Sequence, residues 1–259
     1  MPDIHPLSVV HEQARLADDV VVGPFCTIGP EVTIGSGTRL ISHVAMDGRT
    51  TIGERNTFFP ASVIGFVPQD LKYKGEPTQL CVGNDNTIRE GVTLNLGTVQ
   101  GGGITMLGDN NLLMAYAHMG HDAKVGSNCV IANGVPLAGH VEVQDYATVG
   151  GLAGVAQFVR IGKHAYVAGM ASVDRDIPPY TIAVGSRPCT IKGVNITGLR
   201  RRGFANETIF ALIEAVKLWS DKERHKDKCL PEIVSRLGDI PEVMEFVKFI
   251  SASEGGCIR

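Results

Sequence analysis

Residues 107–142 divide into six hexads, LGDNNL LMAYAH MGHDAK VGSNCV IANGVP LAGHVE, and each hexad opens on an apolar residue. Stepping by six keeps an apolar residue at this position without a gap from Val10 to Ile64 and from Leu107 to Val173. The series breaks across residues 66–80 and again at 101–103, and Gly or Ala often follows the apolar residue. A period of six fits neither an α-helix nor an alternating strand.

This repeat predicts a coil with flat sides, in which every hexad supplies one short strand and one turn. Three hexads close a triangle, so that one coil takes about 18 residues and successive coils stack about 4.8 Å apart. The apolar residues point inward and form ladders along the axis. We therefore predict a mainly β fold, a left-handed parallel β-helix over residues 1–189, and expect the two breaks to be loops that leave the prism.

Residues 190–259 are predicted to form a C-terminal α-helical domain that caps the open strand edges of the last coil. Apolar residues at helical spacing follow Asn206, which we expect to be an N-cap. Pro231 is expected to open a second helix that ends near Gly238, and Pro241 a third.

Composition excludes several classes of protein. The net charge of −3 gives no basic field for nucleic acid. The N-terminus lacks the basic start and apolar run of a secretory signal, and no window has the length and apolarity of a membrane span. The six cysteines are scattered without a C-x-x-C pair, which is typical of reduced thiols in a cytoplasmic protein.

The clearest chemical cluster lies between His118 and Asp122. Met119 points inward, so His121 is expected on the outer surface, with the Asp122 carboxylate at hand to hold its tautomer. His140 lies one coil plus one residue later, and it should stack beside His121 with Gly139 directly above. Such a group suits general-base catalysis, with a glycine N–H for an oxyanion.

Two other interpretations of this cluster stay open. Histidines on surface turns are common and inert. Alternatively, His118, His121 and His140 could ligate zinc, as in hexapeptide-repeat enzymes that resemble the γ-type carbonic anhydrases.

Two further features are charge and loop length. No acidic residue occurs between Asp176 and Glu207, although this stretch carries five basic residues: Arg187, Lys192, Arg200, Arg201 and Arg202. It is either a pyrophosphate or acidic-protein site or a solvated turn. The first break carries Asp70 and Lys72 as its best polar contacts, and it either covers a ligand or clasps a trimer.

Taken together, these residues resemble the UDP-N-acetylglucosamine O-acyltransferases that begin lipid A synthesis in Gram-negative bacteria. The resemblance covers nearly the whole chain. Its motifs, in order, are Ile4-His5-Pro6, Pro68 to Tyr73, Thr98 to Gly103, Asn111 to Met114, Ala117-His118 with His121-Asp122, Leu137 to His140, Asp176 to Tyr180, and Gly193 to Asn195 with Gly198 to Phe204.

The resemblance implies a cytoplasmic homotrimer with active sites between adjacent prisms. His121 is the implied general base, oriented by Asp122, and it takes the proton from the sugar 3-position; the Gly139 N–H is the implied oxyanion donor. Substrate contacts are implied at two groups of residues: Asp70, Lys72, His118, His140 and Gln157, and then Asn195, Arg201 and Arg202, which hold UDP or phosphopantetheine.

The resemblance implies no metal and no bound cofactor, because the phosphopantetheine arm arrives on acyl carrier protein. That carrier is acidic, which suits the basic stretch. The same resemblance points to Gly169 and Met170 as determinants of acyl length, with an acyl or 3-hydroxyacyl chain of about 10–14 carbons expected, each methylene contributing about 0.8 kcal/mol.

The chain departs from the family pattern at a few positions. Ala156 stands where the family has His, Thr197 where an acidic residue is common, and Asn95-Leu96-Gly97 where a more polar run is common. These departures leave open whether the acceptor is UDP-N-acetylglucosamine or its 3-amino analogue, which would give an amide.

Three alternative functions remain. A sister N-acyltransferase carries an added N-terminal domain, for which a repeat that starts at Val10 leaves no room. A zinc hydratase requires bound metal. A catalytically silent scaffold has no need of His-Asp, Gly-His and the arginine run together.

Overall fold

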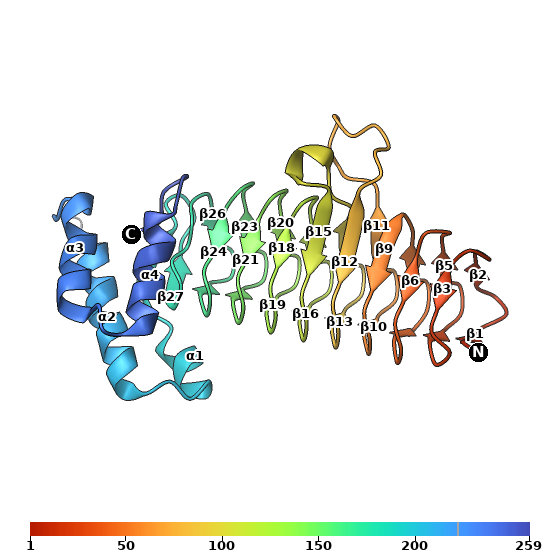
Figure 1. Cartoon of the computed structure of the whole chain (residues 1–259), viewed down its shortest axis with the longest axis horizontal. Helices are drawn as coiled ribbons and strands as arrows, with labels where there is room; N and C mark the ends of the chain where they lie inside the picture. Colours follow the sequence, from red (N-terminus) through yellow and green to blue (C-terminus); the bar gives the residue numbers. More distant parts are fainter. Residues whose placement is uncertain (222) are drawn as a thin grey trace.

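The predicted β-helix is present in the structure, a computed structural model that describes residues 1–221 and 223–259. Within these residues the strands of the coils form three sheets of 11, 9 and 8 strands, here named A, B and C. Figure 1 shows the coils stacked along the long axis, with the helices beyond the last coil. The left-handed parallel β-helix with a C-terminal helical part is therefore confirmed.

Sheet A contains β1 (Asp3–Ile4), β4 (Val21–Val22), β7 (Arg39–Leu40), β10 (Thr57–Phe58), β13 (Thr87–Ile88), β16 (Leu112–Leu113), β19 (Val130–Ile131), β22 (Thr148–Val149), β25 (Tyr166–Val167), β27 (Thr181–Val184) and β28 (Thr190–Val194). Sheet B contains β2 (Val9–Val10), β5 (Thr27–Ile28), β8 (Ala45–Met46), β11 (Val63–Phe66), β14 (Thr93–Asn95), β17 (His118–Met119), β20 (Pro136–Leu137), β23 (Gly154–Val155) and β26 (Ser172–Val173). Sheet C contains β3 (Arg15–Leu16), β6 (Thr33–Ile34), β9 (Arg49–Ile52), β12 (Gln79–Val82), β15 (Ile104–Leu107), β18 (Lys124–Val125), β21 (Glu142–Val143) and β24 (Arg160–Ile161).

The coil register follows the predicted repeat. Val21 of β4 pairs with Asp3 of β1, so the partner lies three hexads earlier in the chain. The coils are longer where the two loops leave the prism, and there Thr87 of β13 pairs with Thr57, and Leu112 of β16 pairs with Thr87. The core nevertheless continues through these longer coils, because their inward residues, such as Ile88, are fully buried.

A second buried position accompanies the predicted one. From Val20 onward, the residue two places before each inward residue is also buried, and it is mostly Val, Ala or Cys, as at Val20, Val92, Ala123, Cys129 and Val141. The coil interior therefore holds one large and one small side chain from each hexad. This alternation of large and small side chains suits a close-packed prism.

The coils turn at three corners, which we name BC, CA and AB after the sheets that they join. Most turns from residue 25 onward hold one residue with positive φ, and non-glycine residues take this conformation repeatedly along a corner, as at Asp122, His140 and Phe158 of corner BC. Both loops leave at corner BC, between β11 and β12 and between β14 and β15. In Figure 1 they rise along the upper edge of the prism.

Asparagines align the coils from which the loops depart. Asn86 is buried and its Nδ2 donates to Asn56 Oδ1 at 3.0 Å, while its own Oδ1 accepts from the Asn111 N–H at 2.9 Å. Asn111 continues the chain by accepting from the Cys129 N–H at 2.7 Å. These bonds connect four coils across corner CA, at the point where the sequence spacing is irregular.

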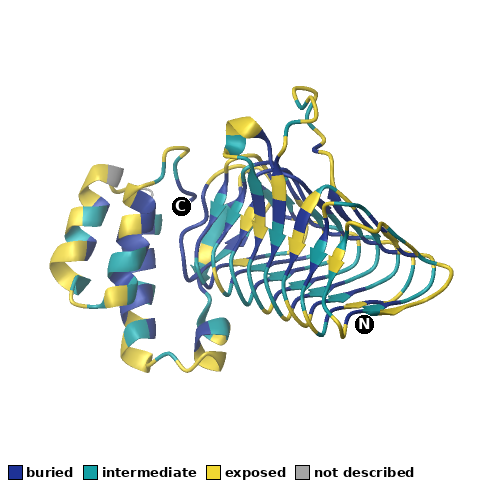
Figure 2. Cartoon of the chain, turned by 45° about the vertical axis from the view of Figure 1, so that its right-hand side comes forward, coloured by how far each residue is buried: buried dark blue, intermediate teal, exposed yellow. Residues whose placement is uncertain are grey.

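The chain ends in a helical part with its own core. It contains α1 (Ile196–Arg201), α2 (Asn206–Ser220), α3 (Lys226–Leu237) and α4 (Pro241–Ser251). Apolar side chains of α2 and α4 form a second buried cluster around Leu212 and Phe246. Figure 2 shows the buried faces of these helices turned toward one another and toward the coils.

Buried polar contacts join the helices to the last coils. Asp176 accepts from Arg160 Nε at 2.9 Å and from Ser253 Oγ at 2.8 Å, and Tyr180 donates to Glu245 of α4. The strand edge of the last coil is covered by β27 and β28, which pair antiparallel. The first helix, α1, begins at Ile196. The division of the chain into two domains between residues 189 and 190 stays a prediction.

The individual helix starts were predicted with mixed success. Pro241 opens α4, as predicted. The N-cap of α2 is Ala205 rather than Asn206, with no side-chain hydrogen bond. Pro231 lies inside α3 instead of opening it, because the extra turn from residue 226 buries Cys229 in the helical core. Among the described residues no helix has the length and apolarity to cross a membrane.

We expect Asn86→Leu to destabilise the fold by about 1–3 kcal/mol, because it leaves the buried Asn111 N–H without a partner and removes one of the two bonds that Asn56 Oδ1 accepts from Asn86. Chemical denaturation at pH 7 measures the loss. Thr87→Val, on the next residue, keeps the ladder and is the matched control. An Asn86→Leu variant as stable as this control would contradict the role of the ladder.

Candidate active site

His121 and Asp122 form a hydrogen-bonded pair at corner BC. His121 Nδ1 lies 2.8 Å from Asp122 Oδ2. The Thr98 N–H donates to Asp122 Oδ1 at 2.7 Å, and the Thr98 hydroxyl donates to Oδ2 at 2.6 Å. Because both Asp122 oxygens already accept from Thr98, the bond to His121 suits a tautomer with its N–H at Nδ1, which leaves a free lone pair on Nε2.

The second loop buries this pair. Thr98 begins the 3-10 turn η1 (Val99–Gly101), and a Cβ on Gly101 would lie 2.0 Å from Asp122 Cγ, so only glycine fits there. His121 was predicted on the outer surface. It does lie outside the coil, but it is only 9% exposed, because this loop and the Gly139 backbone cover it. Sequence reasoning quoted Thr98 in a motif but gave it no role.

Gly139 and His140 stack on His121 as the repeat predicted. A Cβ on Gly139 would lie 2.7 Å from His121 Nε2, so the glycine lets the imidazole lie against the backbone. Within the described residues the Gly139 N–H donates to no acceptor. The His140 ring meets the His121 ring edge-on at 5.1 Å between centroids, and Phe158 stacks on His140 at 4.4 Å.

His118 lies apart from this group. Its Nδ1 is 2.7 Å from the Thr93 hydroxyl on sheet B. Burial lowers the pKa of His118, and burial also lowers the pKa of His140, against the opposing charges of Asp122 and Asp70. Both imidazoles are therefore neutral near pH 7. Among the described residues, those with metal-ligating atoms within 4.8 Å of one another are His121, Asp122 and His140, and the predicted zinc set with His118 does not gather.

The first loop contributes charge to the same corner. Asp70 is the residue of this loop whose charge acts on His140, and its Oδ1 accepts from the Lys72 N–H at 2.9 Å. Lys72 is exposed. Beneath the second loop, Asn95 Oδ1 is buried without a hydrogen-bond partner.

A cavity of about 440 Å³ continues from His140 toward the helical part. Gln157 and Phe158 line it on the coil side, together with Arg175 and Glu254 near the C-terminal segment. The structure thus places Gln157 and His140 on the lining of the same cavity. Arg175 was not singled out from the sequence, because an isolated arginine in a turn carries no motif signal.

The arginine run lies at a different corner of the prism. Arg201 ends α1 and Arg202 follows it, with the Arg202 guanidinium 4.7 Å from the centre of the Tyr146 ring at corner CA. Asn195 caps α1 by accepting from the Gly198 N–H, and its Nδ2 donates to the His164 carbonyl. In Figure 1, α1 lies at the lower edge, opposite the loops.

Rings stack along corner CA beneath this arginine. His164 lies between Tyr146 and Tyr180, with centroid distances of 4.7 and 5.8 Å. Burial, assisted by the charges of Lys163 and Arg202, lowers the pKa of His164 to about 4. The column therefore contains a neutral imidazole at pH 7.

Gly169 and Met170 lie at the third corner. Corner AB also carries exposed apolar side chains one coil or more apart: Phe25, Tyr116, Leu152 and Met170, which are 52%, 74%, 66% and 74% exposed. In one chain, the predicted base, the arginines and the acyl-length residues thus occupy three separate corners.

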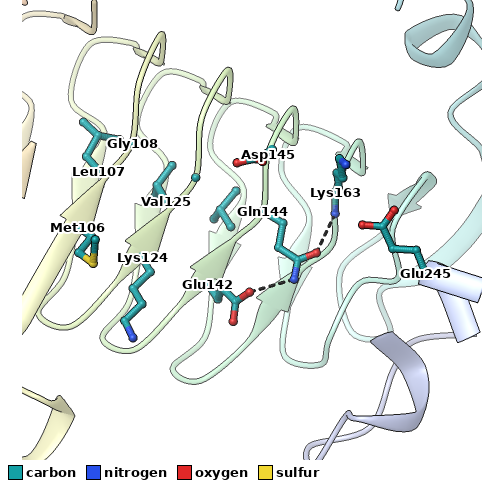
Figure 3. A pocket seen from close by; sticks show the side chains of 12 residues that line it. Met106, Leu107, Gly108, Lys124, Val125, Glu142, Gln144, Asp145, Lys163 and Glu245 are labelled. Carbon is teal, nitrogen blue, oxygen red and sulfur yellow. Dashed lines mark hydrogen bonds between the residues drawn. The ribbon is translucent and has the colours of Figure 1, made fainter. Parts of the chain in front are cut away.

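The outer side of sheet C holds a further cavity, of about 520 Å³. Figure 3 shows Lys124 and Glu142 projecting from the strands and Glu245 reaching in from α4. None of the residues predicted for chemistry lines this cavity. We therefore place the candidate active site at corner BC.

Comparison with known proteins agrees with this fold. The description "Bacterial transferase hexapeptide (six repeats)" matches residues 105–135, which defines the chain as a hexapeptide-repeat transferase by class. The description "Udp N-acetylglucosamine O-acyltransferase; Domain 2" matches residues 176–258.

Relatives resemble the chain over its full length. A curated protein of Thermodesulfovibrio yellowstonii, named acyl-[acyl-carrier-protein]–UDP-N-acetylglucosamine O-acyltransferase, is 46% identical, with 100% of each chain covered. The chain therefore belongs to the UDP-N-acetylglucosamine O-acyltransferase family. The solved Bacteroides fragilis acyltransferase is 38% identical with a TM-score of 0.96, covering 99% of this chain and 100% of its own. The Francisella novicida enzyme is 40% identical with a TM-score of 0.93, covering 99% and 94%.

The low pKa of His164 predicts that stability falls in mild acid. Below pH 6.5 the unfolded chain binds a proton that the folded chain binds only near pH 4. The unfolding free energy should therefore be unaffected above pH 7 and lower by about 2 kcal/mol at pH 5. His164→Phe keeps the ring stack without the titration. Denaturation of both proteins at pH 7 and 5 should show a smaller loss for the variant, and equal losses would contradict the prediction.

Proposed function

We propose that this protein transfers an acyl chain, 3-hydroxylated or not, from acyl carrier protein to the 3-hydroxyl of UDP-N-acetylglucosamine, as the first step of lipid A synthesis in the cytoplasm. The observation that carries the proposal is the buried His121–Asp122 pair beside an unpaired Gly139 N–H. Family membership over the whole chain supports it.

In this reaction His121 acts as general base. Asp122 and Thr98 hold Nδ1 as the protonated nitrogen, which leaves Nε2 to accept the proton of the sugar 3-hydroxyl. The hydroxyl oxygen attacks the thioester carbonyl, a C–O bond forms, and the C–S bond breaks. Nε2 then returns the proton to the pantetheine sulfur. The products are the 3-O-acyl sugar nucleotide and the free thiol of the carrier.

The Gly139 N–H is proposed to stabilise the oxyanion of the tetrahedral intermediate. It lies beside His121 and has no acceptor of its own among the described residues. A preorganised backbone donor in a buried site stabilises developing charge without reorganisation. The reaction then needs no metal and no bound cofactor, because the carrier brings the phosphopantetheine.

A homotrimer would bring the three corners of different chains together. If corner AB lies on a threefold axis, its exposed apolar residues face those of two other copies. Sheet B of one prism then faces sheet A of the next. Corner BC, with His121, comes beside corner CA of the neighbour, with Arg201 and Arg202. Two groups that are remote in one chain would thus form a single site.

The arginines at this joint suit phosphate groups. Arg201 is exposed, and Arg202 is held over Tyr146 with its guanidinium edge accessible. We propose that Arg201, Arg202 and Asn195 contact UDP or phosphopantetheine, and that the basic stretch receives the acidic carrier. Asp70, Lys72, His118, His140 and Gln157 are proposed substrate contacts, and Gly169 with Met170 is proposed to limit acyl length.

His121→Ala should lower acyl transfer about 100- to 10,000-fold, because it removes the base. The assay supplies 3-hydroxyacyl carrier proteins with UDP-N-acetylglucosamine or its 3-amino analogue, and compares wild type with the variant. His11→Ala, an exposed histidine of the first coil, is the matched control. A preference for the 3-amino sugar would mean that the product is an amide rather than an ester. Acyl transfer that survives His121→Ala would overturn the mechanism.

Leu152→Glu should dissociate the assembly, because three carboxylates would meet at the threefold axis. Light scattering should give a molar mass near three times 27.6 kDa for wild type and near 27.6 kDa for the variant. Met106→Glu, on the outer side of sheet C, is the control and should stay trimeric. A monomeric wild type would refute the site between chains.

A further inference from the structure

Aromatic rings occupy the last three turns of corner CA, at Tyr146, His164 and Tyr180, which we name the CA column. Their φ values are 62°, 55° and 67°, all in the left-handed region. On the two coils before them the same turn position holds Asn110 and Asn128. Asparagine tolerates this conformation because its short polar side chain can hydrogen-bond locally, whereas an aromatic side chain has no such advantage. Backbone conformation therefore does not explain the rings.

The CA column is anchored in the core at one end. Tyr180 is fully buried, and its hydroxyl donates to Glu245 of α4. His164 is buried above it, and its ring plane lies within 2° of the Tyr146 ring plane. Tyr146, at the other end, is half-buried. The outermost ring thus rests on two buried rings, which limits its movement.

The same column holds the chain on both sides of Arg202. Before it, the Asn195 N–H donates to the Tyr180 carbonyl at 2.7 Å, and Asn195 Nδ2 donates to the His164 carbonyl at 3.0 Å. After it, the Phe204 ring meets the His164 ring edge-on, with 5.0 Å between centroids. The backbone of α1 and of the residues that follow is therefore fixed relative to the column.

The Arg202 side chain rests on the column through a single ring. Its guanidinium lies 4.7 Å from the centre of the Tyr146 ring. No hydrogen bond or ion pair joins it to another of the described residues. A guanidinium that stacks on a ring keeps its N–H edges free for a bidentate contact with an anion. Because His164 is neutral near pH 7, the column places no opposing charge beneath this cation.

We propose that Tyr146 is a positioning residue of acyl transfer, and that its ring, backed by the CA column, holds the Arg202 guanidinium ready for a phosphate group of a substrate. This inference rests on the proposed function, in which Arg202 contacts UDP or phosphopantetheine. Both groups offer the same chemistry, since each carries phosphate oxygens that a guanidinium binds bidentately. Because the ring contacts the arginine and not the reacting atoms, we expect it to act on substrate binding rather than on the chemical step.

The test is steady-state kinetics of Tyr146→Asn with UDP-N-acetylglucosamine and a 3-hydroxyacyl carrier protein, each varied in turn. The KM for the substrate whose phosphate Arg202 binds should rise about five- to tenfold, because the guanidinium loses its support, while kcat stays within about twofold of wild type. A rise for the sugar nucleotide identifies the pyrophosphate of UDP, and a rise for the carrier identifies phosphopantetheine. Asparagine suits the backbone of this turn, as at Asn128, so the variant should fold.

Tyr146→Phe is the matched control, since it keeps the ring and removes the hydroxyl. Both of its KM values should stay within about twofold of those of wild type. Unchanged KM values in Tyr146→Asn, or a fall in kcat alone, would overturn the inference.

A double variant separates support of the arginine from support of α1 as a whole. Arg202→Ala should raise the same KM, and the addition of Tyr146→Asn should raise it no further, because the ring then has no guanidinium to hold. A further rise of the same size would contradict the inference, since the ring would then act through α1 rather than through Arg202. Failure of the proposed function looks different, because Arg202→Ala would then leave both KM values unchanged.

Discussion

The hydrogen bonding of each coil to the one before it, three hexads earlier in the chain, is the constraint on which the rest of the structure depends. Parallel pairing at this spacing forces every sixth residue inward and places every third turn at the same corner. The chemistry then follows from position. A residue one coil plus one place after His121 must lie beside it, which is how His140 and Gly139 arrive there.

The two loops use this constraint without breaking it. Each leaves and returns at corner BC, so the sheets continue through the two longer coils. The asparagine ladder of Asn56, Asn86 and Asn111 restores alignment at corner CA of the same coils. The second loop places Thr98 over Asp122, and so turns an exposed pair into a buried one.

The predicted base, the arginines and the exposed apolar residues lie at three separate corners, and this separation is the reason for proposing the assembly. A triangular prism cannot bring corners BC, CA and AB of one chain to one point. Three prisms around an axis can join BC of one chain to CA of the next, while the apolar AB corners meet at the centre. In this proposal the triangular cross-section of the prism is the reason both for the trimer and for a site built from two chains.

The hexad pattern by itself determined the coil, its inward ladder, the two loops and the stacking of His140 on His121, because stacking is a consequence of period. It did not determine the starts of α2 and α3: Ala205 caps α2 without a side-chain hydrogen bond, and α3 begins at Lys226, before Pro231, so that Cys229 is buried in the helical core. Only the tertiary structure decided that His121 is buried, that Thr98 fixes the Asp122 carboxylate, and that Arg202 rests on Tyr146. These contacts join segments brought together by loops and by a helix without the period of six, and sequence spacing carries no information about them.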